Sequence, residues 1–198
     1  MNRDVGNEIE RFASEVFEKF SSKDGSQEIA RVDALIEIGG LVKSREIDSV
    51  LEIGSGIGTV VSFLQNKHIF GNLKIYGFEK NDWCREQLSK NVAEFHQICS
   101  LEELMRFNKN VDLIIIDDFI SSEITQSLIN KVKPRFIFIE GHRRRQRLYV
   151  LESLENNDIK SRFVNFRKTS RSYKVGCLFD CTAKKKNHCF AKLHITSG

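Results

Sequence analysis

The sequence predicts an α/β domain built on a doubly wound, mostly parallel seven-stranded sheet, with helices on both faces and a C-terminal antiparallel hairpin. Short apolar runs alternate with segments of helical periodicity between residues 49 and 140. Parallel strands need crossover connections, and the intervening helices supply them. Two further strand-like runs flank a polar turn at 167–172, which predicts the hairpin.

Each element is predicted from its own local pattern. The predicted strands cover 49–53, 74–79, 95–98, 111–116, 135–140, 159–166 and 173–179. The predicted helices cover 5–20, 27–43, 59–65, 82–92, a short segment after Ser100, 121–131 and 144–154. Ser100 is placed to cap the helix that begins with Glu102 and Glu103. Pro134 follows the predicted helix over 121–131 and ends it.

Composition predicts a single globular domain over 1–198. With 198 residues, 40% apolar and 29% charged, the chain can bury a full core. We divide it into an N-terminal helical cover (1–44), a core (45–181) and a basic tail (182–198). The first residues lack the apolar core of a signal peptide, and no apolar run approaches the ~20 residues that a membrane span needs. Its five cysteines are scattered, which favours reduced thiols and a cytoplasmic protein without a membrane partner.

Charge is distributed unevenly along the chain. Residues 1–130 carry 14 Lys and Arg against 22 Asp and Glu, a balance of −8. Residues 131–198 carry 17 against 5, a balance of +12. This asymmetry indicates a face that meets an anionic partner, although a solvated basic surface without a ligand explains it as well.

The segment Glu52-Ile53-Gly54-Ser55-Gly56-Ile57-Gly58 is the main functional signal. Glycines allow a sharp turn and let backbone N–H groups approach a ligand closely, and the next helix directs its N-terminus at the same place. The dinucleotide fingerprint G-x-G-x-x-G fails, because its third glycine position is Thr59. A phosphate-binding P-loop is excluded because no lysine follows these glycines.

The acid-x-Gly-x-Gly-x-Gly pattern resembles motif I of the class I S-adenosylmethionine-dependent methyltransferases, and the strand order resembles their seven-stranded sheet over roughly residues 27–180. The resemblance implies an enzyme that uses S-adenosylmethionine, with a loose likeness to the small-molecule O-methyltransferases. It implies that Glu52 and the turn contact the methionine end of the cofactor, that Glu79 binds the ribose hydroxyls, and that Ser100 and Leu101 lie near the adenine. The cofactor-binding set is Glu52, Gly54, Ser55, Gly56, Gly58, Glu79, Lys80, Ser100, Leu101 and Asp117. The alternative for Glu79 is a surface acid paired with Lys80.

Asp117 and Asp118, which close the strand over 111–116, are the predicted catalytic residues. Either could orient the sulfonium end of the cofactor or accept a proton from the substrate. Some O-methyltransferases of this fold bind a divalent metal at positions that match Asp117 and Glu140. Two acids are too few for a hard cation, so no metal is predicted. The Asn/Asp-Pro-Pro-aromatic motif of amino-methylating nucleic-acid enzymes is absent.

A run of cations follows the strand over 135–140. Glu140, His142, Arg143, Arg144 and Arg145 form the predicted substrate-binding set. Arginines at a helix N-terminus oppose the helix dipole, so they need acidic neighbours or an anionic ligand, and arginine binds phosphate or carboxylate through two hydrogen bonds. Salt-bridged or solvated arginines remain the alternative, and His142 is a base or a bystander.

The C-terminal cysteines and histidines are a weaker signal. Cys177, Cys181, His188, Cys189 and His194 lack the C-x-x-C spacing of a zinc site, and strand residues four apart lie ~13 Å from each other. The predicted function is methyl transfer to an oxygen or nitrogen of a small, anionic acceptor. Two alternatives remain open: a nucleic-acid methyltransferase or binder that uses the basic C-terminal third, and a non-catalytic scaffold with this fold.

Overall fold

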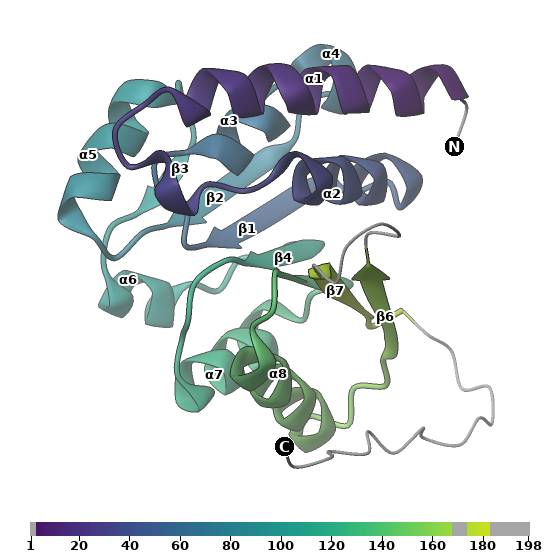
Figure 1. The fold of residues 1–198 in the computed structure, drawn as a ribbon. Coiled ribbons are helices and arrows are strands. Elements are labelled where there is room, and N and C mark those ends of the chain that lie inside the picture. The colour runs from purple at the N-terminus through teal and green to yellow at the C-terminus, as the bar shows by residue number, and fades with distance from the viewer. Residues whose placement is uncertain (1–2, 168–173, 183–198) are drawn as a thin grey trace, which may run out of the picture.

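A computed structural model of the chain describes residues 3–167 and 174–182. Its sheet has seven strands in the order β3-β2-β1-β4-β5-β7-β6 (Figure 1). The strands are β1 (Ser49–Ile53), β2 (Lys74–Phe78), β3 (His96–Ile98), β4 (Leu113–Ile116), β5 (Phe136–Glu140), β6 (Arg162–Arg167) and β7 (Lys174–Asp180). β1 to β5 are parallel, and β7 runs antiparallel to both β5 and β6. The predicted fold class is confirmed.

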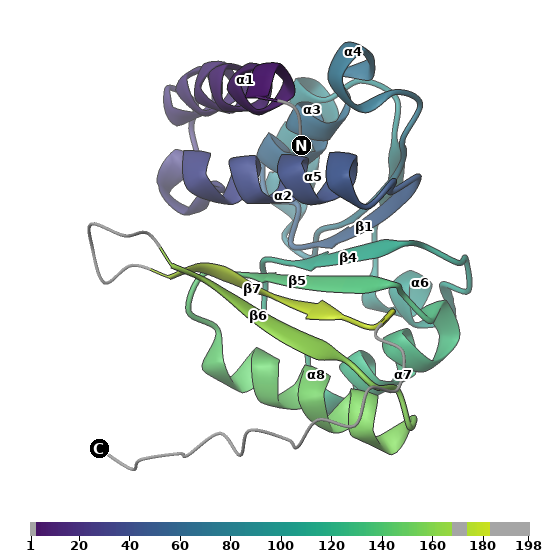
Figure 2. The same ribbon diagram turned by 90° about the vertical axis from the view of Figure 1, so that its right-hand side faces the viewer.

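Helices cover both faces of this sheet, as Figures 1 and 2 show. One face carries α1 (Arg3–Ser21), α2 (Val32–Ser44), α3 (Thr59–Leu64), α4 (Lys67–Phe70) and α5 (Asp82–Asn91). The other face carries α6 (Leu101–Arg106), α7 (Ser122–Val132) and α8 (Arg144–Asn156). A 3-10 turn, η1 (Ser26–Glu28), joins α1 to α2.

The core is two apolar layers separated by the sheet, because successive strand residues point to opposite faces. On β4, Leu113 and Ile115 belong to the layer beneath α1 and α2, whereas Ile114 and Ile116 belong to the layer above α7 and α8. All four residues are buried. Strands buried on both faces are continuous apolar runs, which explains why the sequence identified them well.

The central strands end level with one another. Ile53 of β1 pairs with Phe78 of β2 and Ile116 of β4, and Ile116 pairs with Ile139 of β5. The residues that directly follow these strands therefore meet at one edge of the sheet. This edge is where open parallel sheets bind their ligands.

The second helix begins later than predicted. It was expected over 27–43, but α2 starts at Val32 after η1 and an extended stretch that includes Arg31. The backbone N–H of Arg31 donates to the carboxyl of Glu140, a contact that a helical residue at this position could not make. α4 was not predicted at all; the side chain of Asn66 caps it by accepting from His68 and Ile69.

Some expectations lie outside the described residues. The polar turn of the hairpin falls largely on residues 168–173, and the basic tail on residues 183–198, which include His188, Cys189 and His194.

Candidate functional site

The glycine turn after β1 lies against the ends of β2 and β4. The backbone N–H groups of Gly54 and Ser55 donate to the carbonyl of Phe78 at 2.8 and 3.1 Å. Gly54 has φ of 89°, and a Cβ there would lie 2.5 Å from the Cβ of Asp118. Gly56 has φ of 52°, but a Cβ there would meet nothing within 4 Å. Gly54 is therefore needed for packing against the β4 loop, whereas Gly56 leaves its side of the turn open.

Glu79 follows β2 and lies beside this turn. Its Oε2 accepts from the backbone N–H of Gly56 at 2.7 Å, and its Oε1 accepts from that of Asn81 at 2.8 Å. Only 6% of the residue is exposed. The alternative of a surface acid paired with Lys80 is therefore wrong. Each carboxylate oxygen keeps a second lone pair, so Glu79 can still accept two more hydrogen bonds.

Lys80 pairs instead with the loop after β4. Its Nζ lies 2.6 Å from Oδ2 of Asp118, and the two side chains are 60% and 30% exposed. A pair this exposed stabilises the fold by less than about 1 kcal/mol. Because Asp118 also packs on Gly54, the ion pair links the loops after β2 and β4 across the glycine turn.

Glu52 is buried beneath the turn. It is 2% exposed, and no described residue forms a hydrogen bond with its Oε2 or with the hydroxyl of Ser55. The pKa of Glu52 is raised to about 8, mainly by burial and to a smaller extent by the charges of Asp117 and Glu79. The nearby Ser55 hydroxyl partly offsets this rise, although it is not aligned for a hydrogen bond. Buried polar atoms without partners are rare, and two of them below a glycine turn indicate room for a polar ligand or water.

Asp117, Glu140 and Arg143 form a second group at the ends of β4 and β5. Arg143 donates to Oδ1 of Asp117 at 2.5 Å. Burial raises the pKa of Glu140 to about 9, and its hydrogen bond with Asp117 raises it as well, while Arg143 acts in the opposite direction. The raised pKa favours the protonated form of Glu140, in which its carboxyl group can donate to Asp117. The sequence predicted these residues as parts of separate sets, but the structure brings them together.

The other cations of this run have different environments. Arg147 donates to the carbonyl of Gly141 at 2.6 Å. The guanidinium of Arg145 lies 5.9 Å from the ring centroid of Phe119. Arg144 and His142 are exposed. Acidic neighbours therefore compensate Arg143, while Arg144 and Arg145 remain accessible to a ligand.

Ser100 and Leu101 follow β3, whose last residue, Ile98, pairs with Phe78 of β2. The Ser100 hydroxyl accepts from the backbone N–H of Glu103 at 3.1 Å and caps α6, as predicted. Leu101 is 48% exposed. Both residues lie at the same edge of the sheet as Glu79, with the Ser100 side chain committed to the cap.

Trp83, which the sequence reasoning missed, lies next to the glycine turn. A Cβ added to Gly25 in the α1–α2 connection would lie 2.5 Å from the Trp83 ring and 3.1 Å from Ile57 of the turn. Trp83 is 43% exposed, and it is the only tryptophan of the chain. The signal was available: a large aromatic residue four positions after a strand-ending acid, at the start of a helix capped by Asn81.

Phe119 is the second residue that was missed, and a firm loop presents it. The next residue, Ile120, is buried and donates its N–H to Oε1 of Gln146 at 3.1 Å. Gln146 is 1% exposed and donates in turn to the hydroxyl of Thr125 at 3.0 Å. An exposed aromatic directly after Asp117 and Asp118 was visible in the sequence, but its support by Gln146 was not.

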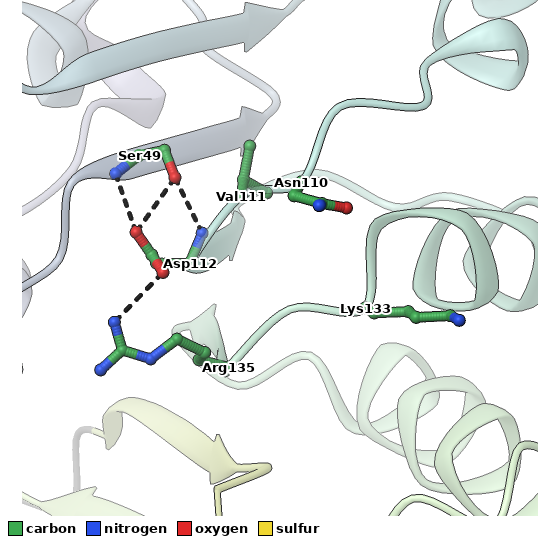
Figure 3. Close-up of a pocket in the computed structure, with 6 residues that line it drawn as sticks. All are labelled: Ser49, Asn110, Val111, Asp112, Lys133 and Arg135. Carbon is green, nitrogen blue, oxygen red and sulfur yellow. Dashed lines mark hydrogen bonds and ion pairs between the residues drawn. The ribbon is translucent and has the colours of Figure 1, made fainter.

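A cavity of about 340 Å³ lies at the opposite edge of the sheet (Figure 3). It is lined by Ser49, Asn110, Val111, Asp112, Lys133 and Arg135. Asp112 accepts from the backbone N–H groups of Asp48 and Ser49 and pairs with Arg135 at 3.1 Å. Burial alone would raise the pKa of Asp112, but these hydrogen bonds together lower it. The polar groups here satisfy one another at the amino ends of the strands, so we interpret the cavity as structural.

Asp112→Ala is expected to destabilise the fold by about 1–3 kcal/mol without changing ligand binding at the glycine turn. The variant leaves the backbone N–H groups of Asp48 and Ser49 without this acceptor and removes the ion pair with Arg135. Urea unfolding, together with a ligand titration of the folded variant, measures both effects. A variant of normal stability with lost ligand binding would contradict the structural interpretation.

The described part of the chain contains no group of three or more His, Cys, Asp or Glu side chains arranged to hold a metal ion. Cys177 is fully buried in the core layer next to α7 and α8, and Cys181 is a free thiol. No helix among the described residues is long and apolar enough to cross a membrane.

The sequence matches no protein-family model and no curated protein sequence. Solved structures match its fold. A methyltransferase of Podospora anserina with bound SAH is 11% identical, with a TM-score of 0.60 over 85% of this chain and 86% of that chain. A putative caffeoyl-CoA O-methyltransferase from Staphylococcus aureus is 15% identical, with a TM-score of 0.59 over 90% of this chain and all of that chain.

A putative RNA methyltransferase from Pyrococcus horikoshii is 12% identical, with a TM-score of 0.55 over 90% of this chain and 94% of that chain. These TM-scores show that the chain shares the fold of these proteins. The sequence identities are too low to show which acceptor it uses. The chain therefore has the seven-stranded fold of the class I S-adenosylmethionine-dependent methyltransferases.

Proposed function

We propose that this chain is an S-adenosylmethionine-dependent methyltransferase whose acceptor is a small anionic molecule with an oxygen or nitrogen nucleophile. The observation that carries the proposal is the contact between Glu79 and Gly56. It joins a carboxylate at the end of β2 to the glycine turn at the end of β1. A cofactor with a ribose and a charged amino-acid end needs both groups in one site.

The residues at this edge of the sheet fit the cofactor. Glu79 retains lone pairs for two ribose hydroxyls. Gly56 has open space beside it, and the buried Glu52 Oε2 and Ser55 hydroxyl have acceptor capacity that no described residue uses. Ser100, Leu101 and Trp83 border the same edge. When bound, S-adenosylmethionine supplies a methyl group activated by a sulfonium.

The chain supplies orientation and a proton acceptor on the other side of the site. Arg143 donates to Asp117 and holds its carboxylate at the end of β4, and Glu140, whose pKa is raised, can donate to the same carboxylate when protonated. Asp118 is held by Lys80 and by the backbone N–H of Phe119. Either aspartate can orient the acceptor and take its proton. Arg144 and Arg145 are exposed and provide positive charge for an anionic group.

The direct test is calorimetric titration of S-adenosylmethionine and S-adenosylhomocysteine into the purified chain and into Glu79→Ala. The wild type should bind both saturably, and Glu79→Ala should weaken binding at least about tenfold, because hydrogen bonds to a charged group are lost. Trp83 provides a second readout, since its fluorescence should change when a ligand fills the adjacent turn.

Two further variants separate binding from folding. Glu79→Gln keeps an acceptor oxygen and should lose less affinity than Glu79→Ala. Glu86→Ala removes an exposed acid of α5 that pairs only with Lys90 among the described residues, and it should bind like the wild type. A folded wild-type chain that binds neither compound would overturn the proposal. If the chain binds RNA tightly and no small-molecule acceptor is found, the acceptor is a nucleic acid and the proposed small acceptor is wrong.

A further inference from the structure

Phe119 is an aromatic residue that the fold leaves partly in water. It is 44% exposed, although fully burying a phenylalanine side chain would stabilise the folded chain by about 1.5–3 kcal/mol. It directly follows Asp117 and Asp118, the two acids at the candidate reaction centre. Single exposed apolar residues are common, so exposure alone assigns no role.

The loop that presents Phe119 is firmly held. Ile120 is buried and bonds to Gln146, as described above, and the N–H of Phe119 donates to Oδ1 of Asp118 at 2.6 Å. Asp118 in turn packs on Gly54 and pairs with Lys80. The backbone at Phe119 is therefore held relative to the glycine turn, so the ring is presented to a ligand from a defined place.

The surroundings of the ring combine aromatic and cationic groups. The Tyr149 ring lies 5.8 Å from that of Phe119 at an angle of 52°. The Arg145 guanidinium lies 5.9 Å from the Phe119 centroid, and Arg144 beside it is also exposed. Both contacts come from α8 and leave almost half of Phe119 accessible.

We infer that the acceptor is a flat aromatic or heteroaromatic ring that carries an anionic group, with its ring on Phe119 and its anion on Arg145. This inference rests on the proposed function and specifies its acceptor. Offset stacking of two rings adds affinity beyond buried area, and a guanidinium binds a carboxylate or phosphate through parallel hydrogen bonds. Stacking on Phe119 brings a ring substituent next to Asp117 and Asp118, where a hydroxyl or amine can lose its proton.

The test compares pairs of probes that differ only in the ring. In the presence of saturating S-adenosylhomocysteine, calorimetry compares 4-hydroxybenzoate with 4-hydroxycyclohexanecarboxylate, and guanosine 5′-monophosphate with ribose 5-phosphate. In at least one pair the aromatic member should bind roughly three- to tenfold more tightly. The pair in which the aromatic member binds more tightly shows whether the anionic group of the acceptor is a carboxylate or a phosphate.

Two variants assign the effect to the ring and to the cation. Phe119→Leu keeps an apolar side chain and should remove the preference for the aromatic member. Arg145→Gln should weaken both members of the responding pair about equally. Phe163 is the matched control, because it is 42% exposed but lies on β6, paired with Phe179 near the opposite end of the sheet. Phe163→Leu should bind every probe like the wild type.

The outcomes separate this inference from the proposed function. Equal binding within both pairs, no binding of any probe up to about 5 mM, or an unchanged preference in Phe119→Leu would each overturn the aromatic acceptor. If S-adenosylhomocysteine binds in the same experiments, the proposed cofactor remains supported whatever the probes do. If it does not bind the wild type, the proposed function itself is overturned, and the inference about the acceptor, which rests on it, is overturned as well. A single-stranded RNA that binds in place of all four probes would overturn the small acceptor.

Discussion

Gly54→Ala is expected to destabilise the fold by about 3–5 kcal/mol and to abolish cofactor binding. A Cβ at this position would lie 2.5 Å from the Cβ of Asp118 and 2.9 Å from its backbone nitrogen, neither of which is the end of a flexible side chain. The φ of 89° is an additional cost for any residue with a Cβ. The turn and the loop after β4 would have to move apart, which weakens the hydrogen bonds from the N–H groups of Asp117 and Asp118 to the carbonyl of Ile53.

A glycine series separates packing from ligand access. Gly56→Ala has the φ cost but no clash, so it should lose only about 1–2 kcal/mol while its methyl group occupies the space proposed for the ligand. Gly40→Ala in α2 has neither clash nor positive φ, and it should stabilise the fold by about 0.5–1 kcal/mol. Thermal melts and titration of S-adenosylhomocysteine measure both properties for each variant.

Stability and ligand binding should respond differently across this series. Stability should fall in the order Gly40→Ala, wild type, Gly56→Ala and Gly54→Ala. Only Gly54→Ala and Gly56→Ala should lose binding of S-adenosylhomocysteine. If Gly56→Ala binds like the wild type, the open side of the turn is not the ligand side. If Gly54→Ala melts like the wild type, the contact with Asp118 does not hold the turn in place.

The fold could be predicted from sequence because its central strands, β1, β4 and β5, are buried on both faces. Runs such as Leu113–Ile116 have no polar alternation, and each ends at a polar residue or glycine where the chain leaves the sheet. The same rule located Glu52, Glu79, Asp117 and Glu140, since the carboxyl ends of parallel strands lie at one edge. Local pattern was therefore sufficient for the strands and for which residues share that edge.

The contacts within the site depend on tertiary structure and could not be predicted. Arg143 and Asp117 are 26 positions apart, and their pairing depends on how the loop before α8 turns back over β4. The late start of α2 also depends on a tertiary contact. The backbone N–H of Arg31 donates to Glu140 instead of to a carbonyl one helical turn earlier. The alternative for Glu79 paired it with Lys80 on proximity alone, but the geometry brings Lys80 to Asp118.

The free energy of unfolding is expected to fall as pH rises from about 4.5 to 9. Burial raises the pKa of Glu52 to about 8 and that of Glu140 to about 9, from an ordinary value of 4.5. Across this window the folded chain keeps protons that the unfolded chain releases, so each rise in pH favours the unfolded state. The dependence should level off above the folded pKa values.

The size of this effect can be measured on Glu52 alone. One pKa unit corresponds to about 1.4 kcal/mol, so ionising Glu52 between pH 5.5 and 8.5 should cost on the order of 3 kcal/mol. Glu52→Gln is neutral throughout and should remove that share of the pH dependence in urea unfolding. The variant should be close to the wild type at pH 5.5 and more stable than it at pH 8.5.

The control is an acid whose pKa is shifted the other way. A hydrogen bond from Ser121 lowers the pKa of the exposed Glu123 in the first turn of α7, so Glu123→Gln should change the pH dependence only below about pH 4.5. If Glu52→Gln and the wild type show the same slope between pH 5.5 and 8.5, Glu52 is already ionised in the folded chain. The proposal that burial keeps Glu52 protonated beneath the turn would then be wrong.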